Sequence, residues 1–522
     1  MSTIVGNQNL RVMWEQLASE RANHLFLSFE SREGVRKEYS YERFDRLINK
    51  TANALIGKGI SRGDKVAVQL YNSPEHIAAC FALAKIGAVA VPLNMQHTLP
   101  ECSYIFDSCG IDSVIAEPDC QYYYCSDDPH ARESVYKMRN VLICHADGAE
   151  LFGSSVDFDA LVSACDDVLR FACEIDPLDD AMIIFTSGTT SAPKGVELTH
   201  ANMLFGGYYG DWQCGLGPED RLLTTMPAFH SNFQTAALMP VLTAGATLVY
   251  IEKYSARRFW KQVREYRATA IQMVAMMART MMLQPVDEGE RCHCVKSVQY
   301  YLAISQNEKE AFEERFAVRL QNCYGLTESV CWVLTDFAFG PRRWPSIGRV
   351  GLGYEVMVAD ESGNELEAGS AGEILVRGIP GVSLMKGYLG KPDITASTID
   401  GDGWLHTGDT GYVDEAGWFY FVDRKTNMIK RAGENISSTE VEDVLMHHPS
   451  VKETAVIGVD DPIRDQAVKA FVVLKDGASA DADSIISFCK GILAHFKVPT
   501  IVEFVDELPH TSVGKVAKKL LS

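Results

Sequence analysis

The sequence predicts an α/β protein in which a large N-terminal domain of layered βαβ sheets carries a β-rich subdomain and is followed by a small α+β domain. Two observations indicate the large domain. Short apolar strands alternate with helical patterns, and 522 residues exceed what one simple core can bury. After Gly340 the pattern changes to short strands separated by turns, which is typical of a β-rich subdomain. We therefore place the large domain at residues 1–423, its β-rich part at about 340–423 and the small domain at 424–522.

Apolar runs and helical patterns locate the elements. In the large domain, strands are expected at Lys65–Leu70, Ala181–Phe185, Asp220–Met226, Gly245–Ile251 and Val318–Cys323, and helices at Tyr41–Leu55, after Ser73, at Thr199–Tyr209 and at Ala256–Tyr266. Strands are next expected at Tyr354–Ala359, Glu373–Val376, Ala455–Val459 and Lys469–Leu474, and helices at Glu440–His447 and Ile485–Lys490. The polar, irregular segment Glu117–Leu161 is interpreted as a surface excursion, and the methionine-rich segment Ala270–Met282 as flexible core.

Composition excludes several classes of protein. The content of 47% apolar and 23% charged residues is that of an ordinary globular protein, and a formal charge of -20 argues against binding to nucleic acid or anionic membrane. Neither a signal-peptide pattern nor a run of eighteen apolar residues is seen, so we expect a cytoplasmic protein. Among fourteen cysteines, neither Cys292-His293-Cys294 nor the pair Cys120 and Cys125 has a second pair at zinc-site spacing, which indicates free thiols.

A hydroxyl-rich string, Thr186–Gly195 (TSGTTSAPKG), follows the expected strand Ala181–Phe185. In such a loop, backbone N–H groups near glycine and the hydroxyls of Ser and Thr donate to an anion, and Lys194 adds positive charge. Most clusters of this composition are plain surface loops. The string also lacks the G-K-[ST] ending of the Walker pattern, so by itself it indicates only a candidate phosphate-binding loop.

Four further groups of residues follow in order along the chain. They are YGLTE at 324–328, GWLHTGD at 403–409, FVDR at 421–424 with GENI at 433–436, and SVGK at 512–515. Each alone has an ordinary explanation, such as a helix cap, a turn or a solvated tail. Together with TSGTTSAPKG they resemble, in order and over nearly the full chain, the adenylate-forming superfamily of acyl-CoA synthetases, luciferases and peptide-synthetase adenylation domains.

The resemblance implies a role for each matching residue when a carboxylate attacks the α-phosphate of ATP. The family's adenylation lysine matches Lys515, its Mg²⁺ ligand matches Glu328 and its α-phosphate-facing hydroxyl matches Thr327. The adenine-stacking ring matches Tyr324, and the ribose-binding pair matches Asp409 and Arg424. The β- and γ-phosphates would be held by Thr186, Ser187, Gly188, Thr189, Thr190, Lys194 and Gly195. These types suit the chemistry, because converging anions need positive charge and Mg²⁺ accepts one carboxylate plus phosphate oxygens.

The resemblance also implies a second half-reaction, in which the thiol of coenzyme A attacks the acyl adenylate. In the family a mobile C-terminal domain swings about a hinge, here around Thr426, where many relatives carry Lys or Asp. Gly433 resembles the glycine that lines the pantetheine tunnel, and His230 resembles the aromatic gate of that tunnel. Two other departures are the stretch 300–305 (YYLAIS) in place of a GGAP-like sequence and His510 in the terminal motif.

Stretches between the motifs resemble the branch that activates betaine acids, the crotonobetaine/carnitine–CoA ligases. They are 207–214 (GYYGDWQC), 252–257 (EKYSAR) and 342–351 (RRWPSIGRVG). A trimethylammonium group cannot donate hydrogen bonds, so aromatic faces and a nearby carboxylate are its natural partners. We expect a cage of two or three aromatic residues near the carboxylate of Asp211, drawn from Tyr208, Tyr209, Trp212, Phe233, Tyr300, Tyr301 and Trp332. For any single one of these, ordinary core packing is the competing interpretation.

The predicted activity is ATP-dependent ligation of a small carboxylic acid to CoA, with crotonobetaine, carnitine or γ-butyrobetaine as the acid. A short- or medium-chain fatty acid or an aryl acid is the alternative substrate. A peptide-synthetase module fits less well, because no carrier-domain motif follows Lys515. A non-catalytic nucleotide-binding regulator is a further alternative, against which stands the presence of Glu328, Asp409, Arg424 and Lys515 together.

Overall fold

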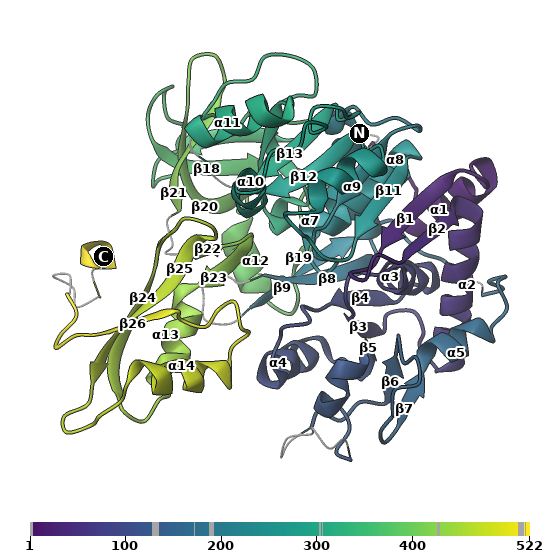
Figure 1. The fold of residues 1–522 in the computed structure, drawn as a ribbon, viewed down its shortest axis with the longest axis horizontal. Coiled ribbons are helices and arrows are strands. Elements are labelled where there is room, and N and C mark those ends of the chain that lie inside the picture. The colour runs from purple at the N-terminus through teal and green to yellow at the C-terminus, as the bar shows by residue number, and fades with distance from the viewer. Residues whose placement is uncertain are drawn as a thin grey trace.

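The computed structural model describes residues 4–127, 135–171, 173–186, 193–301, 304, 306–424, 428–509, 516 and 518–522. Within them a large α/β part carries a smaller unit at its side (Figure 1). Several sequence predictions lie outside the described residues, namely Ser187, Gly188, Thr189, Thr190, Thr426, Lys515 and the side chains of Tyr301 and Arg424.

A nine-stranded sheet forms one layer of the large part. Its strand order is β16-β15-β14-β13-β12-β10-β11-β1-β2. The strands from β1 through β11, β10, β12 and β13 to β14 pair in parallel, and the outer strands pair antiparallel. The bounds are β1 Leu25–Glu30, β2 Arg36–Ser40, β10 Arg221–Thr224, β11 Thr247–Ile251, β12 Ala270–Val274, β13 Ser297–Tyr301, β14 Leu320–Gly325, β15 Trp332–Thr335 and β16 Arg349–Val350.

An eight-stranded sheet, in the order β19-β9-β8-β4-β3-β5-β6-β7, forms the second layer. Its bounds are β3 Lys65–Gln69, β4 Val89–Pro92, β5 Ser113–Ala116, β6 Asn140–Ile143, β7 Ser155–Asp157, β8 Asp180–Thr186, β9 Lys194–Thr199 and β19 Gly387–Tyr388. The interpretation of Glu117–Leu161 as a surface excursion is wrong, since β6 and β7 belong to this sheet. The apolar run of β6 is too short to produce a periodic signal among polar neighbours.

Helices pack on both sheets and join them through one hydrophobic core. In α3 the Ser73 side chain accepts from the His76 N–H, Pro74 opens the helix and Gly87 closes it in the left-handed conformation. The helices of the large part are α1 Leu10–Glu20, α2 Tyr41–Gly57, α3 Pro74–Ile86, α4 Leu99–Cys109, η1 Pro118–Tyr123, α5 Phe158–Ser163, α6 His200–Cys214, α7 Ser231–Phe233, the π-helix η2 Gln234–Leu238, α8 Met239–Ala244, α9 Phe259–Glu265, α10 Ala275–Met282, α11 Gln306–Phe316, η3 Thr327–Ser329 and α12 Pro392–Thr398.

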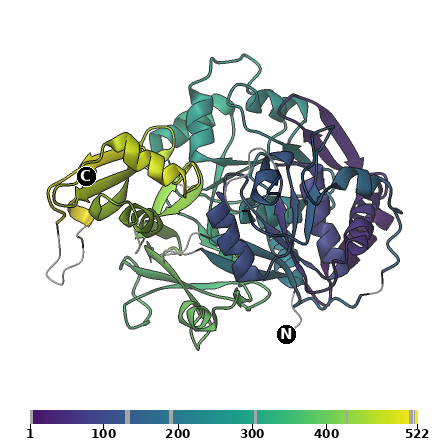
Figure 2. The ribbon, with the colours of Figure 1, turned by 90° about the horizontal axis from the view of Figure 1, so that it is seen from below.

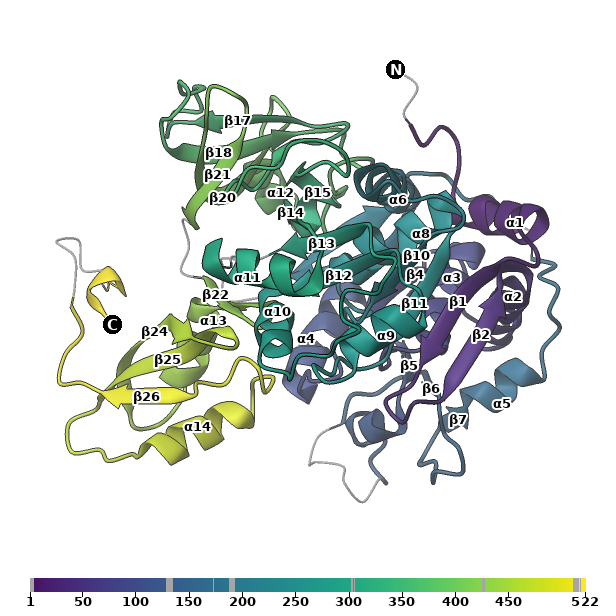
Figure 3. The same ribbon diagram turned by 45° about the horizontal axis from the view of Figure 1, so that its top comes forward.

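Two smaller sheets complete the molecule. A four-stranded antiparallel sheet holds β17 Glu355–Ala359, β18 Gly372–Arg377, β20 Trp404–Val413 and β21 Phe419–Arg424. It lies beside β14 and β15 of the nine-stranded sheet (Figure 3), and a bridge between Gly348 and Phe419 connects it to that edge. A C-terminal unit with its own core follows it in the chain and lies to one side of the large part (Figure 2). Its elements are β22 Met428–Arg431, β23 Glu434–Ser437, α13 Ser438–Met446, β24 Val451–Asp461, β25 Asp465–Leu474, α14 Ala482–Lys490, β26 Ile501–Phe504 and η4 Lys518–Leu520.

The structure confirms the predicted α/β class and places elements at each of the expected strands and helices, with ends that shift by a few residues. The methionine-rich segment 270–282 divides at Val274 into β12 and α10. Met273, Met277 and Met281 are buried, as expected of core residues. All fourteen cysteines are free. Within the described ranges, no helix has the length and apolar character that a membrane span requires.

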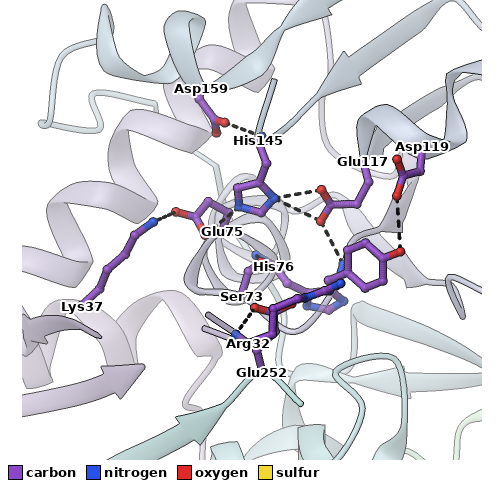
Figure 4. A network of polar contacts seen from close by, with 11 residues as sticks. Arg32, Lys37, Ser73, Glu75, His76, Glu117, Asp119, His145, Asp159 and Glu252 are labelled. Atoms are coloured by element: carbon purple, nitrogen blue, oxygen red, sulfur yellow. Dashed lines mark hydrogen bonds and ion pairs between the residues drawn. The ribbon is translucent and has the colours of Figure 1, made fainter. Parts of the chain in front are cut away.

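A polar network links the loops at the strand ends of the two large sheets (Figure 4). His145, after β6, lies between the carboxylates of Glu117 and Glu75, with N–O distances of 3.0 and 3.2 Å. Lys37, on β2 of the other sheet, pairs with Glu75 at 3.4 Å. Burial alone would lower the pKa of His145, but hydrogen bonds and charge from the two carboxylates outweigh it and raise the pKa to about 10.

Candidate active site

A cavity of about 1340 Å³ lies where the ends of β8 and β14, the four-stranded sheet and the C-terminal unit meet. Most motifs singled out from the sequence contribute to its lining, although they are far apart in the chain. The predicted residues that line it are Thr186, Lys194, His230, Tyr324, Thr327, Glu328, Trp332, Asp409 and Gly433. The described part of the chain therefore brings the nucleotide, metal and thiol predictions to one place.

One end of the cavity combines a lysine, a tyrosine and a glutamate. The Tyr388 hydroxyl donates to Glu328 Oε1 at 2.7 Å, and Lys194 Nζ lies 4.4 Å from the centre of the Tyr388 ring. Thr186 ends β8 beside them, and its buried Oγ1 has no hydrogen-bond partner among the described residues. A hydroxyl and an ammonium group facing a cavity beside a carboxylate are suited to phosphate oxygens and a hard cation.

A second end is formed by the YGLTE and GWLHTGD motifs. The Tyr324 hydroxyl donates to Asp409 Oδ2 at 2.7 Å. Asp409 is buried in β20, directly opposite Arg424 of β21 in the antiparallel pairing.

Gly195, also predicted to bind phosphate, does not line the cavity. A Cβ atom there would lie 2.9 Å from Ile183 Cγ2, so this glycine allows β8 and β9 to pack closely.

The turn after Tyr324 forms the cavity wall between the end that contains Glu328 and the end that contains Asp409. A Cβ atom at Gly325 would lie 2.3 Å from the Cys331 carbonyl oxygen, so only glycine fits the bend. Val330 has a φ of 66°, a costly value for a β-branched residue, and its carbonyl accepts from Thr235 Oγ1 at 2.6 Å. Ser231 Oγ lies 3.2 Å from Thr327 Oγ1. These contacts place α7 and η2 against this turn.

The gate and tunnel predictions meet at the C-terminal unit. His230 Nε2 lies 3.1 Å from Glu434 Oε2, and Gly433, with a φ of 89°, places its backbone at the cavity wall near Val274. Burial alone would lower the pKa of His230, but the Glu434 carboxylate outweighs it, so the pKa lies above the ordinary value. The hydrogen bond between His230 and Glu434 thus favours the protonated imidazole and links the two parts of the chain.

A buried ion cluster makes a second contact between the parts. Lys497 Nζ lies 3.0 Å from Glu101 of α4 and 2.8 Å from Glu440 of α13. The Ala494 N–H donates to the same Glu101 carboxylate, and Thr98 Oγ1 donates to the Ile492 carbonyl at 2.6 Å. Burial would lower the pKa of Lys497, but the two carboxylates raise it above its usual range.

The third end of the cavity is uncharged. Its lining comes from α7, η2 and the approach to β15 and includes Asn232, Thr235, Ala236, Cys331 and Trp332. Such an end can receive an uncharged organic group, because phosphate and ribose groups would find their polar partners at the other ends. Among the predicted substrate residues with described side chains, only Trp332 lies there.

The remaining predicted cage residues lie outside the cavity lining. Tyr209, Phe233 and Tyr300 are core residues, and Phe233 stacks on Tyr250 with ring centres 4.4 Å apart. Tyr208 donates to Gln8 Oε1, and Trp212 is 41% exposed on α6. Burial raises the pKa of Asp211 to about 6, and its carboxylate lies outside the cavity lining. The predicted cage on α6 is therefore wrong, because the positions of these residues around the helix turn their side chains away from η2 and β15.

Two cavity residues, Ser231 and Glu434, and Tyr388, which bonds to the lining residue Glu328, had no assigned role in the sequence interpretation. Glu434 lies within the GENI motif, which indicated a site near Gly433 but did not reveal that Glu434 pairs with His230. Ser231 directly follows His230, so proximity to the gate was a usable signal. Tyr388 stands in a two-residue strand paired with β9, and nothing in the sequence connects it with Glu328.

The residues present fit a nucleotide with Mg²⁺. Among the described residues no group of three or more His, Cys, Asp or Glu side chains could hold a metal ion. Magnesium held by one carboxylate together with substrate phosphates and water needs no such group. The Glu328 carboxylate, with the partnerless Thr186 hydroxyl and Lys194 beside it, supplies this donor set.

Fold and cavity together define an adenylate-forming enzyme, a large α/β part and a small C-terminal unit that share one cavity. The chain belongs to the AMP-binding enzyme family: residues 14–389 match the AMP-binding enzyme domain and residues 440–515 its C-terminal domain. It is similar to the crotonobetaine/carnitine–CoA ligases of Citrobacter koseri and Escherichia coli, at 44% identity over 521 and 519 residues. These alignments cover 99% of each chain.

Solved structures of related enzymes share the fold. The o-succinylbenzoate CoA synthetase of Bacillus subtilis, bound to a product analogue, matches with a TM-score of 0.85 at 24% identity over 99% of this chain and 98% of that one. The amide bond synthetase of Marinactinospora thermotolerans matches with a TM-score of 0.83 at 26% identity over 97% and 98%. ATP-bound MatB of Rhodopseudomonas palustris matches with a TM-score of 0.70 at 26% identity over 98% of each chain.

Proposed function

We propose that this protein is an AMP-forming acid–CoA ligase that acts on a betaine acid such as crotonobetaine, carnitine or γ-butyrobetaine. The observation that carries the proposal is the single cavity that joins Lys194 and Glu328, Tyr324 and Asp409, and Gly433 of the C-terminal unit. Similarity to crotonobetaine/carnitine–CoA ligases over 99% of the chain supports the choice of acid. The acid and ATP form an acyl adenylate and pyrophosphate, and CoA then forms the thioester and releases AMP.

In the first half-reaction, each end of the cavity has a distinct task. Lys194 and the loop hydroxyls hold the β- and γ-phosphates, and Thr327 faces the α-phosphate. Asp409 and Arg424 bind the ribose hydroxyls while Tyr324 stacks on the base. Mg²⁺ held at Glu328 offsets phosphate charge. Lys515 stabilises the charge that develops as the carboxylate attacks.

In the second half-reaction, the C-terminal unit supplies the thiol path. Gly433 leaves room for pantetheine, because any side chain would occupy the wall there. The His230–Glu434 pair holds the gate against the C-terminal unit. We place the start of the mobile C-terminal domain at residue 424, ahead of Thr426.

The uncharged end of the cavity supports a betaine more directly than a fatty acid. Trp332 offers an indole face to a quaternary ammonium group, which needs no hydrogen-bond acceptor. Ala236, Thr235 and Cys331 leave a short pocket that is consistent with a small acid. A short-chain fatty or aryl acid is the second candidate, because the same walls would accept an apolar chain.

ATP–pyrophosphate exchange with crotonobetaine, carnitine, γ-butyrobetaine and a short fatty acid tests the proposal. We expect exchange with at least one betaine and strong discrimination against acids of similar size that lack the cation. Lys515→Ala should lower exchange by about 100-fold or more, as expected when one group that stabilises developing charge is removed. Preferred exchange with the fatty acid would contradict the betaine assignment, and absence of exchange with every acid would contradict the activity.

The cytoplasm is the proposed location. The proposed use of ATP and CoA as co-substrates supports it. Fractionation of cells that produce the native chain, followed by immunodetection, checks this proposal.

A further inference from the structure

A ladder of buried glutamines lies beneath the uncharged end of the cavity. Gln272 of β12, Gln299 of β13 and Gln321 of β14 stand directly opposite one another across three parallel strands. All three are at most 1% exposed. Glutamine has two donors and an acceptor, so its burial is costly unless every group is paired.

The hydrogen bonds of the ladder run in one direction. Thr224 of β10 donates to Gln272 Oε1 at 2.8 Å, and Gln272 Nε2 donates to Gln299 Oε1 at 3.0 Å. Gln299 Nε2 donates in turn to Gln213 Oε1 of α6 at 3.1 Å. Gln321 belongs to the ladder but bonds elsewhere, to the carbonyls of Gln213 and Asp336.

Gln272 also bonds to the cavity wall. Its Nε2 donates to the carbonyl of Ala236 at 2.9 Å and approaches the carbonyl of Asn232 at 3.4 Å. Ala236 lies in the π-helix η2, and both residues line the uncharged end. A π-helical turn is uncommon and costs regular hydrogen bonding, so it persists where other contacts stabilise it. The Gln272 amide satisfies a carbonyl within this turn.

We infer that Gln272 is a positioning residue that sets the depth of the acid-binding end by holding η2 in its π-helical form. The inference rests on the proposed function in taking that end as the acid site. On the opposite side, Thr235 of the same turn bonds to Val330, so η2 is held between the ladder and the turn before β15. Loss of the Gln272 amide frees one side of η2 and displaces Asn232 and Ala236, while the ATP-binding residues keep their contacts.

Acid and ATP titrations of pyrophosphate exchange test the inference, using the acid that the wild-type protein activates best. Gln272→Met keeps the volume and removes both polar groups. We expect the KM for the acid to rise about 10-fold, the effect of one lost buried hydrogen bond, and the KM for ATP to stay unchanged. Gln321→Met is the matched control, because it removes an equally buried rung that has no bond to η2.

Hydrogen exchange by mass spectrometry gives a readout that needs no activity. The backbone amides of residues 234–238 should exchange faster in Gln272→Met than in the wild type. In Gln321→Met their exchange rates should equal those of the wild type. If Gln272→Met does not fold, Thr224→Val should show the same effects in weaker form, because it removes the donor to Gln272 together with the acceptor of the Met226 N–H. The inference is wrong if the folded variants keep both the wild-type KM for the acid and the wild-type rates of hydrogen exchange. Equal effects in Gln321→Met would overturn it as well. Failure of the wild-type chain to activate any acid would instead refute the proposed function.

Discussion

Two tryptophans differ in where their indole rings lie. Trp332 is buried at the uncharged end of the cavity, whereas Trp212 sits on the outer face of α6 against Tyr209 and Phe337. Both were candidates for a cage around a quaternary ammonium group. A desolvated cation–π contact contributes about 2 kcal/mol, and an exposed one much less.

We therefore predict that Trp332→Leu raises the KM for a betaine about 30-fold, which corresponds to about 2 kcal/mol, and leaves the KM for ATP unchanged. Trp212→Leu should change neither constant. Steady-state kinetics with the acid and ATP varied separately measures both. A larger effect at Trp212, or an equal rise in both constants for Trp332→Leu, would show that the cage lies elsewhere.

At the scale of elements, His145 joins the ends of β5 and β6 to the start of α3. It holds Glu117 after β5 and Glu75 at the start of α3, which in turn pairs with Lys37 on the other large sheet. Because the folded pKa of about 10 exceeds the ordinary 6.5, the contribution of His145 to stability is complete below about pH 6.5. It declines as the pH rises toward 10.

His145→Asn removes the positive charge between two carboxylates. We expect the free energy of unfolding at pH 7 to fall by about 2 kcal/mol, below the cost for a fully buried pair because the side chain is 30% exposed. The difference from wild type should shrink as the pH approaches 10. Urea unfolding at several pH values measures it, with His447→Asn on the exposed end of α13 as the control. A difference that does not depend on pH would contradict the role of the charge.

At the scale of the whole molecule, the C-terminal unit contacts the large part through the buried Lys497 cluster and the His230–Glu434 pair. Each charge of this cluster keeps a partner within its own part of the chain. The Thr98 N–H donates to Glu101, and Glu440 lies in the C-terminal unit with Lys497. The contact can therefore open without leaving either charge unpaired, which suits a surface that forms and separates during turnover.

Lys497→Met leaves Glu101 and Glu440 facing one another and should weaken this contact. We predict that CoA-dependent consumption of the acyl adenylate slows about 10-fold or more, while pyrophosphate exchange is unchanged. Single-turnover assays that start from the adenylate separate the steps. Lys296→Met, which removes a lysine paired with Asp220 inside the large part, is the control. An equal loss in both half-reactions would contradict a role confined to the second.

The alternation of strands and helices predicted the α/β class, and the ordered motifs predicted the family and nine of the residues that line the cavity. The roles predicted for Glu328, Asp409 and Gly433 followed from the resemblance of their motifs to the adenylate-forming superfamily. The C-terminal unit was also predictable, since its periodic strands and helices fold around their own core.

Tertiary structure alone decided the acid-binding end and the contacts between the parts. The direction of a side chain on α6 depends on where its position around the helix faces relative to η2. Composition does not encode this direction, so the prediction that Tyr208, Asp211 and Trp212 line the acid site was wrong. The pairing of Tyr388 with Glu328, of Lys497 with Glu101 and of Gln272 with η2 depends on strand register and on segments far apart in the chain. Short sequence motifs determine the local chemistry of the site. Substrate specificity depends on how elements distant in the chain pack against one another, and only the tertiary structure decides that packing.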